Sequence, residues 1–471
     1  MYLKRTFRYS CLVQNYYFQD FLSRFDAAGN LACSCGQTHH IGTRSVLAGP
    51  EAFRDSAALL ATELGSRARL WVLSDENTEK AAGEKWKAGV RAARISAHIL
   101  PGHPKPAPTA ELVSALAEEV RRASPDLLVA VGSGVISDLV KRVSLEVDIQ
   151  NWCVVTAASV DAYSSATAAI EVNGFHNAVP ARVSRIIVCD LDVIAKAPRE
   201  MFLAGLGDLL AKYLAFLDWN LSRIMTGEHY CPVISRMALE SARSALSAAR
   251  KLRDDPGEAV RTLTDAALSS GFAMQAFGSS RSAASVEHTM AHLWETADAV
   301  RNVRLDLHGI LAGAASRIVL CGYQALYARL ESFEPDNAAR LSAYARESSW
   351  QDSMEEGLLP FIVKVREEMA ARTFDRDILA QRLRAFRTGK AEILALARST
   401  LEELAAAVTT LDGIGYPFSP AELGIDVSCV LLPFRNARLL RKRYTGFDLA
   451  YELGLESVLT EAGEACVEAG R

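Results

Sequence analysis

The chain has 471 residues, half of them apolar, which is enough to bury the cores of two domains. Its 52 basic and 56 acidic residues nearly balance, and no basic block is interleaved with aromatic side chains, so nucleic acid is a poor candidate partner. No run of 18 apolar residues occurs, and the first 21 residues carry charges throughout, so we expect neither a membrane span nor a signal peptide. These features indicate a cytoplasmic protein that acts on small molecules.

Nine cysteines are scattered singly along the chain, apart from the pair Cys33 and Cys35. An odd number without a secretory signal predicts reduced thiols rather than a disulfide framework. Together with His39 and His40, the pair offers soft metal ligands. A spacing of one residue is also the alternation of an extended strand, however, and no second ligand cluster is obvious elsewhere in the sequence. We therefore favour a strand over a structural zinc site at these residues.

Five apolar runs bounded by polar or turn residues predict buried strands. Helical periodicity lies between the first four runs, for example over residues 110–123, so strand and helix alternate and a parallel sheet is expected. Within residues 167–185, Asn173-Gly174 separates two extended segments and predicts a hairpin. The five predicted strands are residues 70–73, 95–100, 127–131, 152–155 and 186–191.

The character of the chain changes after about residue 196, where Ala, Leu, Glu and Arg dominate. Long amphipathic stretches then predict a nearly all-helical second half, and Pro198 is the expected hinge. The predicted fold is an α/β nucleotide-binding domain with a Rossmann-like parallel sheet over residues 1–196, followed by an all-α metal- and substrate-binding domain over 197–471. The clearest helical stretches are residues 233–252, 258–277, 309–331 and 391–408.

Glycines mark a candidate nucleotide site at Gly132-Ser133-Gly134, between a predicted strand and a predicted helix. A diphosphate needs backbone N–H groups that it can approach closely at a helix N-terminus, and this turn supplies both. The spacing is not GxGxxG, so an ordinary tight turn is the alternative. Asp75, after the strand at 70–73, is placed to accept hydrogen bonds from a ribose, or to cap a helix.

Candidate metal ligands are Asp208, His288 and His308, which lie in helical sequence and would leave a coordination position open. Taken singly, such an aspartate is usually an N-cap, and such a histidine is usually a satisfied polar residue. His288 and His292 are four residues apart and share a helix face, so one can bind metal while the other reaches a substrate. Spacing alone does not assign the two roles.

These motifs occur in an order that resembles the sn-glycerol-1-phosphate dehydrogenase family of the bacterial type. That family is grouped with glycerol dehydrogenase, iron-containing alcohol dehydrogenases and dehydroquinate synthase, so the resemblance implies a dehydroquinate-synthase-like fold. It extends from about residue 30, with Cys33-Ser34-Cys35-Gly36, to about residue 325. The motifs are GSGxxxDxxK from Gly132, TAASxDxxxS from Thr156, GxGDxxxK from Gly205, EHxxxH from Glu287 and LHG from Leu307.

The resemblance implies an NAD(P)-dependent dehydrogenase that binds one divalent metal ion and forms a homodimer or a larger homo-oligomer. Asp208, His288 and His308 would hold zinc, nickel or iron, and Asp161, Asp208 and His292 would contact a phosphorylated substrate. The cofactor would contact Asp75, Gly132, Ser133, Gly134, Val135, Ile136, Thr156, Ala157, Ala158, Ser159 and Ser165.

Two catalytic roles follow from that assignment. With Asp208 as a metal and substrate ligand, His292, or water held by it, is the candidate proton relay, because neutral imidazole exchanges a proton near pH 7. A second-shell or substrate hydrogen bond is the alternative for His292. Asp161 would orient the substrate, or cap the approach to the hairpin.

The chain departs from the family pattern just before the first histidine. Relatives have the sequence SRPxSGxEHHxxH where this chain has SRSAASVEHTMAH. The predicted metal ligands are therefore retained, while we expect the substrate pocket to be altered. Arg281 is retained, either for a bidentate contact to phosphate or as solvated surface. The replaced positions are Ser282, Ala284, Ser285 and Thr289, with Ala162 in place of a glycine.

Three functions are compatible with these residues. The first is a metal-dependent dehydrogenase that interconverts dihydroxyacetone phosphate and sn-glycerol 1-phosphate. The second is a dehydroquinate-synthase-like cyclase, or a dehydrogenase for another polyol or phosphorylated ketone, although Lys141 fits the dehydrogenase pattern better than the cyclase pattern GGGxxxDxxG. The third is a non-catalytic nucleotide-binding descendant, which retention of all three metal ligands disfavours.

Three properties stay open. Asp75 favours NAD over NADP unless a nearby basic residue accepts the 2′-phosphate. The ligand set suits zinc, nickel and iron alike. The helical sequence beyond about residue 330, including the basic turn from Arg438 to Arg443, would form an oligomer interface or a lid.

Overall fold

The computed structural model describes residues 22–92, 94–172, 175–296, 307–344, 354–370, 372 and 376–470. Internal contacts divide the chain into two compact units, and each unit draws on two stretches of sequence. The first unit contains Met1–Leu209 and Arg236–Ser280, and the second contains Leu210–Ser235 and Arg281–Arg471. The predicted domain boundary between residues 196 and 197 stays a prediction.

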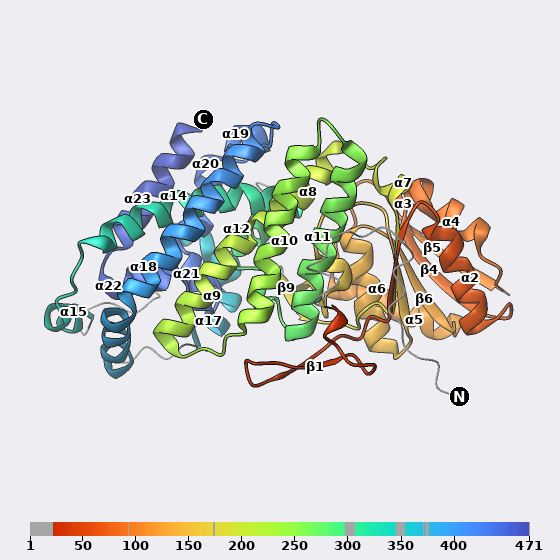
Figure 1. Ribbon diagram of the computed structural model, residues 1–471, viewed down its shortest axis with the longest axis horizontal. Helices are drawn as coiled ribbons and strands as arrows, with labels where there is room; N and C mark the ends of the chain where they lie inside the picture. Colours follow the sequence, from red (N-terminus) through yellow and green to blue (C-terminus); the bar gives the residue numbers. More distant parts are fainter. Residues whose placement is uncertain are drawn as a thin grey trace. The chain divides into compact units, whose positions relative to one another are not determined.

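A six-stranded, all-parallel sheet forms the centre of the first unit, in the order β3-β10-β7-β6-β4-β5. Three of its strands, β4, β5 and β6, are labelled in Figure 1. All five predicted strands are confirmed, although the last ends one residue early because Asp190 caps α7 (Leu191–Ile194). The prediction missed β3, in which only Val46 and Leu47 are buried. The strands are β3 (Ser45–Gly49), β4 (Arg69–Asp75), β5 (Arg94–Leu100), β6 (Leu127–Gly132), β7 (Asn151–Val155) and β10 (Ile186–Asp190).

Helices cover both faces of this sheet, because both sets of alternating side chains along the central strands are buried. On one face, Leu60 of α2 (Ala52–Leu64) and Trp86 of α4 (Glu84–Gly89) join the core formed by Val72 and Val129. On the other face, the Trp71 indole donates to Glu119 of α5 at 2.8 Å. That face is covered by α5 (Ala110–Ala123) and α6 (Gly134–Val147), so the predicted α/β layering is confirmed.

Two antiparallel hairpins accompany the sheet. The predicted hairpin is confirmed as β8 (Thr167–Val172) and β9 (Phe175–Pro180), while its turn at Asn173-Gly174 lies outside the described residues. A smaller hairpin pairs β1 (Asn30–Ala32) with β2 (Thr38–His40). The remaining short elements of the first unit are α3 (Glu76–Thr78), η1 (Glu79–Gly83) and η2 (Ala162–Ser164). Its longer helices are α8 (Arg199–Leu210), α10 (Pro232–Lys251) and α11 (Pro256–Phe277). The boundaries between the two units in the sequence fall within α8 and α10.

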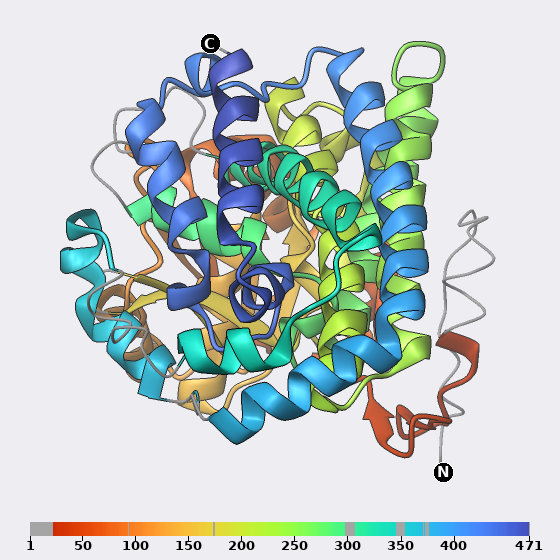
Figure 2. The same cartoon turned by 90° about the vertical axis from the view of Figure 1, so that its left-hand side faces the viewer.

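Throughout its described residues the second unit is helical, as predicted. Its longest helix is α18 (Arg376–Asp412), which packs on α9 (Lys212–Thr226) and α14 (His308–Glu331). Figure 2 shows α14 in teal beside the dark blue α23 (Glu456–Ala469), and the two helices pack together. The other helices are η3 (Ser280–Ser282, at the division), α12 (Val286–Thr296), α15 (Asn337–Tyr344), η4 (Glu356–Phe361), α17 (Ile362–Ala370), α19 (Pro420–Leu423), α20 (Val427–Arg435), α21 (Ala437–Leu440) and α22 (Gly446–Leu453).

The four helical stretches predicted from the sequence fall in α10, α11, α14 and α18. Among the described helices, α14 alone is long and apolar enough to cross a membrane, and 78% of its apolar window is buried inside the protein. The core helix of a globular protein meets the same criterion, so α14 is weak evidence for a membrane span.

Candidate functional site

Predicted cofactor residues lie together at one edge of the parallel sheet. Because β6 pairs with both β4 and β7, the carboxyl ends of these three strands are neighbours. They bring Asp75, Gly132 and Thr156 to the same edge, and the Thr156 N–H donates to the Gly132 carbonyl at 3.2 Å. Open parallel sheets bind their ligands at this edge.

The glycine turn has the geometry that an anion requires. Gly132 ends β6, and a Cβ there would lie only 2.6 Å from Cβ of Ile136, so the close approach of strand and helix needs glycine. Ser133 is the N-cap of α6 but makes no side-chain cap within the described chain. The first N–H groups of α6 are therefore left to another acceptor, such as a diphosphate.

Asp75 performs the helix-capping role that the sequence left as an alternative. Its Oδ1 accepts the N–H groups of Asn77 and Thr78, both at 2.8 Å, in a capping box at the start of α3. Contact of the same carboxylate with a ribose stays a prediction.

The sequence reasoning used Asp138 and Lys141 only as letters of a motif, but they form a buried ion pair. The Lys141 ammonium lies 2.8 Å from Asp138 Oδ1 and donates to the carbonyls of Ala162 and Thr167, both at 2.7 Å. It also lies 3.1 Å from the hydroxyl of Ser165, a predicted cofactor contact. The pair thus fixes the loop that follows β7, and the three-residue spacing on one helix was the sequence signal for it.

Asp161 and Asp208, both predicted substrate residues, are in direct contact within the first unit. The Asp161 N–H donates to Asp208 Oδ2 at 2.9 Å, and Asp161 Oδ2 accepts the Ser270 hydroxyl of α11 at 2.6 Å. A Cβ on Gly205 would lie 1.9 Å from the Ala158 carbonyl oxygen, so glycine lets α8 approach this loop. Ser270 was missed because it lies 109 residues beyond Asp161.

Three predicted histidines gather within the second unit, where α12 packs on α14. The ring centroids of His288 and His292 lie 6.4 Å apart, and those of His288 and His308 lie 5.1 Å apart. His292 and His308 stack at 4.7 Å. The structure therefore joins residues that are separated by 16 to 20 positions in the sequence.

Carboxylates orient all three of these rings. Nδ1 of His288 lies 3.0 Å from Glu287, while Glu295 bridges Nδ1 of His292 at 3.0 Å and Nδ1 of His308 at 3.2 Å. Since an ionised carboxylate only accepts hydrogen bonds, Nδ1 is the nitrogen that carries the proton when the ring is neutral, and Nε2 then keeps its lone pair. Metal-binding histidines adopt this tautomer. The sequence reasoning missed Glu295, although it follows His292 by three residues on the same helix.

The protonation states of this cluster follow from burial and from mutual contact. Burial lowers the pKa of His292 well below its usual range, although the hydrogen bond that its Nδ1–H donates to Glu295 acts in the opposite direction. Burial alone would raise the pKa of Glu295, but the charge of His308 and the hydrogen bonds of both histidines hold that pKa well below its usual range. The result is a neutral imidazole at His292 beside an ionised carboxylate.

Arg281 is buried, with 3% of its surface exposed, so the solvated-surface alternative was wrong. Its Nε and Nη2 contact the two carboxylate oxygens of Glu228 at 2.9 and 3.0 Å, and Nη2 also donates to the carbonyls of Asp218 and Tyr444. Burial opposes ionisation of Glu228, but Arg281 holds the pKa of that carboxyl below its usual value. A phosphate at Arg281 would have to compete with this carboxylate.

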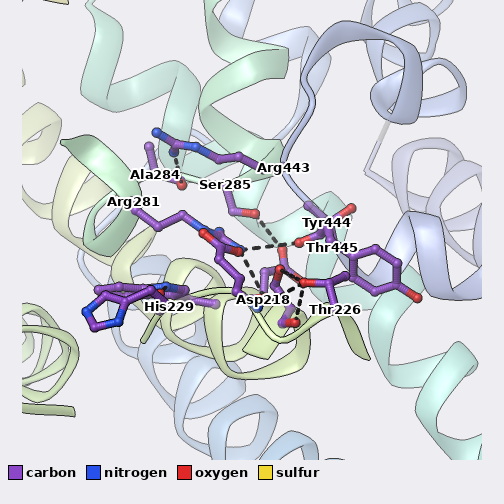
Figure 3. Close-up of polar contacts among 12 residues, drawn as sticks. Asp218, Thr226, His229, Arg281, Ala284, Ser285, Arg443, Tyr444 and Thr445 are labelled. Atoms are coloured by element: carbon purple, nitrogen blue, oxygen red, sulfur yellow. Dashed lines mark hydrogen bonds and ion pairs between the residues drawn. The ribbon is translucent and has the colours of Figure 1, made fainter. Parts of the chain in front are cut away.

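The altered loop before α12 is anchored on buried Asp218 (Figure 3). The Asp218 carboxylate accepts the Ser285 hydroxyl at 2.5 Å, and the Tyr323 hydroxyl and the Gly446 N–H at 3.0 Å. Burial raises the pKa of Asp218 to about 7 despite these hydrogen bonds. Ser285, which replaces the family glycine, thus ties the start of α12 to the C-terminal segment.

A second bond joins the same two segments. Nη1 of Arg443 donates to the Ala284 carbonyl at 2.8 Å (Figure 3). The hydroxyl of Ser282 is buried without a hydrogen-bond partner among the described residues, and nothing in the structure explains that substitution. The role of the C-terminal segment as an oligomer interface or lid stays a prediction.

Sequence comparisons agree with this architecture. Residues 47–198 match the family model described as iron-containing alcohol dehydrogenase. A glycerol-1-phosphate dehydrogenase (NAD(P)+) of Geobacillus thermodenitrificans is 32% identical over 202 residues, which cover 43% of this chain and 50% of the relative. The enzyme of the same name from Metallosphaera sedula is 34% identical over 207 residues, covering 44% and 58%. The chain thus spans about half the length of these curated relatives.

Solved structures extend the likeness of fold to nearly the whole chain. A probable glycerol dehydrogenase from Sinorhizobium meliloti gives a TM-score of 0.56 at 18% identity, covering 90% of this chain and 95% of the other. Glycerol dehydrogenase from Schizosaccharomyces pombe gives 0.56 at 15% identity, covering 91% of each. Residues 47–198 are thus similar in sequence to the iron-containing alcohol dehydrogenases, and nearly the whole chain is similar in fold to the glycerol dehydrogenases, in agreement with the resemblance of its motifs.

Proposed function

We propose that the protein is a metal-dependent, NAD(P)-linked oxidoreductase that interconverts dihydroxyacetone phosphate and sn-glycerol 1-phosphate. The observation that carries this proposal is the histidine cluster of His288, His292 and His308, in which carboxylates hold every Nδ1 and leave every Nε2 as a ligand or base. Relatives named glycerol-1-phosphate dehydrogenase support the choice of substrate.

The donor types of the three predicted ligands suit a divalent metal ion. Asp208, His288 and His308 would hold it, because one carboxylate and two imidazoles suit zinc, nickel and iron and leave a coordination position for a substrate oxygen. When bound, the ion supplies a Lewis acid that polarises the ketone oxygen. The carboxylate behind each imidazole increases its basicity as a ligand.

For the cofactor, we propose that the α6 N-terminus at Gly132-Ser133-Gly134 binds the diphosphate of NAD(P). Val135 and Ile136 lie in the first turn of this helix, and the segment 156–159 follows the neighbouring strand β7. Asp138 and Lys141 hold Ser165 and its loop in place beside them. A carboxylate at Asp75 disfavours a 2′-phosphate and favours NAD.

The chain's own residues then orient the substrate and move its proton. Asp161, whose carboxylate is fixed by the Ser270 hydroxyl, orients the substrate hydroxyl groups. In the oxidation direction, Nε2 of His292 accepts the proton of the alcohol while Nδ1–H stays bonded to Glu295, whose negative charge stabilises the imidazolium. Reduction reverses this transfer.

The decisive experiment is oxidation of NADH by the purified, metal-reconstituted protein with dihydroxyacetone phosphate, repeated after chelation and with Asp208→Ala and His308→Ala. We expect turnover that chelation and both substitutions abolish. Absence of turnover from protein that demonstrably holds metal and NADH would overturn the proposal. Light scattering of the same sample tests the proposed homodimer, and cell fractionation tests the proposed cytoplasmic location.

A second candidate is a dehydrogenase for another polyol or phosphorylated ketone. The bidentate pairing of Arg281 with Glu228 favours it, because that arginine is already engaged by a carboxylate. A panel of phosphorylated and unphosphorylated ketones, assayed with the same NADH readout, separates the two candidates.

A further inference from the structure

We propose that Cys33, Cys35 and His39 form a structural zinc site on the β1–β2 hairpin of the first unit. This site would be separate from the ligand set at Asp208, His288 and His308, and it does not depend on the proposed oxidoreductase activity. It would hold the hairpin in place rather than contact a substrate.

The three ligand atoms already lie close together. All of them are within 4.8 Å of one another, and Cys35 Sγ is 3.4 Å from Nε2 of His39. Tetrahedral zinc with bonds of about 2.3 Å to sulfur and about 2.05 Å to nitrogen separates such a pair of ligands by about 3.6 Å. Only small side-chain movements are needed to coordinate the ion.

The hairpin turn produces this convergence. Cys33 and Cys35 lie in the turn between β1 and β2, so their interpretation as alternating residues of a strand was wrong. The Cys33 N–H donates to the Gln37 carbonyl, and the Gly36 N–H donates to the Cys33 carbonyl, both at 3.0 Å. Gly36 has a φ of 87°, a conformation that favours glycine. The tight turn places both sulfurs close to His39, at the turn end of the hairpin.

His39 is oriented as a ligand by a bond outside the hairpin. Its Nδ1 lies 3.1 Å from the carbonyl oxygen of Ala276 on α11. A carbonyl only accepts hydrogen bonds, so Nδ1 carries the proton and the Nε2 lone pair faces Cys35. His39 is 2% exposed, whereas the exposed His40 is bonded through its Nδ1 to Asn30. Of the two histidines, His39 is therefore the ligand.

The strands of this hairpin are short. Each strand has three residues, and an isolated two-stranded hairpin is marginally stable in water. Beyond His39, the hairpin is tied to α11 through the N–H groups of Gly42 and Thr43, which donate to the Gln275 side chain. Zinc would cross-link the turn to β2 with the loss of two thiol protons, so binding strengthens as pH rises. A fourth ligand would come from another cysteine or from water.

Cobalt is the probe for the site in the full-length protein. Thiolate ligation gives Co²⁺ an intense near-ultraviolet charge-transfer band, which a site built of imidazole and carboxylate lacks. We expect the reconstituted wild-type protein to show this band and to bind two equivalents of metal. We also expect zinc to protect two thiols from a disulfide reagent such as Ellman's.

Substitutions at each ligand set show which site binds which of the two metal equivalents. Cys33→Ser, Cys35→Ser and His39→Ala should each remove one equivalent and abolish or strongly weaken the band, while Asp208→Ala and His308→Ala should remove the other equivalent and keep the band. The matched controls are Cys429→Ser, at a half-exposed cysteine on α20, and His40→Ala; both should change neither. Serine substitution of the cysteines other than Cys33, Cys35 and Cys429, one at a time, tests whether a further cysteine is the fourth ligand.

The proposal is overturned if the wild-type cobalt protein shows no thiolate band, a result that does not depend on the folding of any variant. It is also overturned if the band persists unchanged in folded Cys33→Ser and Cys35→Ser proteins. A thiolate band in protein that holds both metal equivalents and NADH but shows no dehydrogenase turnover would support the zinc site and reject the proposed function.

Discussion

Each unit of the protein uses one buried charge to hold a loop, but the two charges are satisfied differently. In the first unit, the Lys141 ammonium is paired with Asp138 at 2.8 Å and fixes the loop after β7. In the second unit, the Asp218 carboxylate is bonded to two hydroxyls and one N–H, and the pKa of Asp218 is raised to about 7. An opposite charge keeps a buried ion ionised, whereas neutral donors offset only part of the cost of burial.

The largest effect should follow from breaking the charged pair. Lys141→Met leaves Asp138 as an uncompensated buried charge, so we expect the free energy of unfolding to fall by about 3–5 kcal/mol, measured by urea denaturation. Arg142→Met, at the more exposed neighbouring position, is the control and should cost less than about 1 kcal/mol. Equal losses in both variants would contradict a special role for the pair.

Glu295 is another buried charge of the second unit, and it extends the comparison because two histidines keep it ionised. Glu295→Gln retains the size of the side chain but removes the charge behind His292 and His308. We expect metal affinity to fall by about 10- to 100-fold in equilibrium dialysis. Glu287→Gln should weaken affinity through His288 alone. Unchanged affinity in Glu295→Gln would show that the carboxylate does not support the ligands.

The pH dependence of stability tests whether the neutral hydrogen-bond donors around Asp218 leave its pKa raised. Because its folded pKa of about 7 exceeds its unfolded value of 3.8, the folded state binds more protons between these values, and stability falls as pH rises through them. The slope from this group is at most about 1.4 kcal/mol per pH unit. Asp218→Asn should lack this component, so its stability relative to wild type should improve from pH 5 to pH 8 in urea titrations. A constant difference across this range would contradict the raised pKa.

The smallest effect is expected at the loop itself. Ser285→Ala removes a hydroxyl donor from Asp218 and should cost about 1–3 kcal/mol in unfolding free energy at pH 8. Ser282→Ala, in the same loop, is the matched control, because the Ser282 hydroxyl has no partner among the described residues. Similar losses in the two variants would mean that the bond to Asp218 contributes nothing specific.

Sequence reasoning succeeded where a local pattern determines the structure. The continuous apolar runs of β4, β6 and β7 and the helical spacing of α5 depend on near neighbours, and so does the glycine turn at Gly132. It failed at β3, a strand with two buried residues, and at the cysteine turn, because the spacing of Cys33 and Cys35 fits a strand and a turn equally well.

Contacts between residues far apart in the chain could not be predicted from the sequence. Asp218 meets Ser285 across 67 positions and Gly446 across 228, and no periodicity links them. Arg281 was expected at a phosphate or in solvent because its partner, Glu228, lies 53 residues earlier in a different segment. Glu295, by contrast, could have been found, since it follows His292 by one helical turn.

The division of the chain also bears on how the protein is made. The first unit is completed by Arg236–Ser280, which the ribosome delivers only after Leu210–Ser235 of the second unit has been synthesised. Ser270, which fixes Asp161, and Gln275, which anchors Gly42 and Thr43, both belong to that late segment. A nascent chain that stops at residue 209 therefore lacks these contacts, however well its sheet has formed, and the first unit reaches its native arrangement only after translation has passed residue 275.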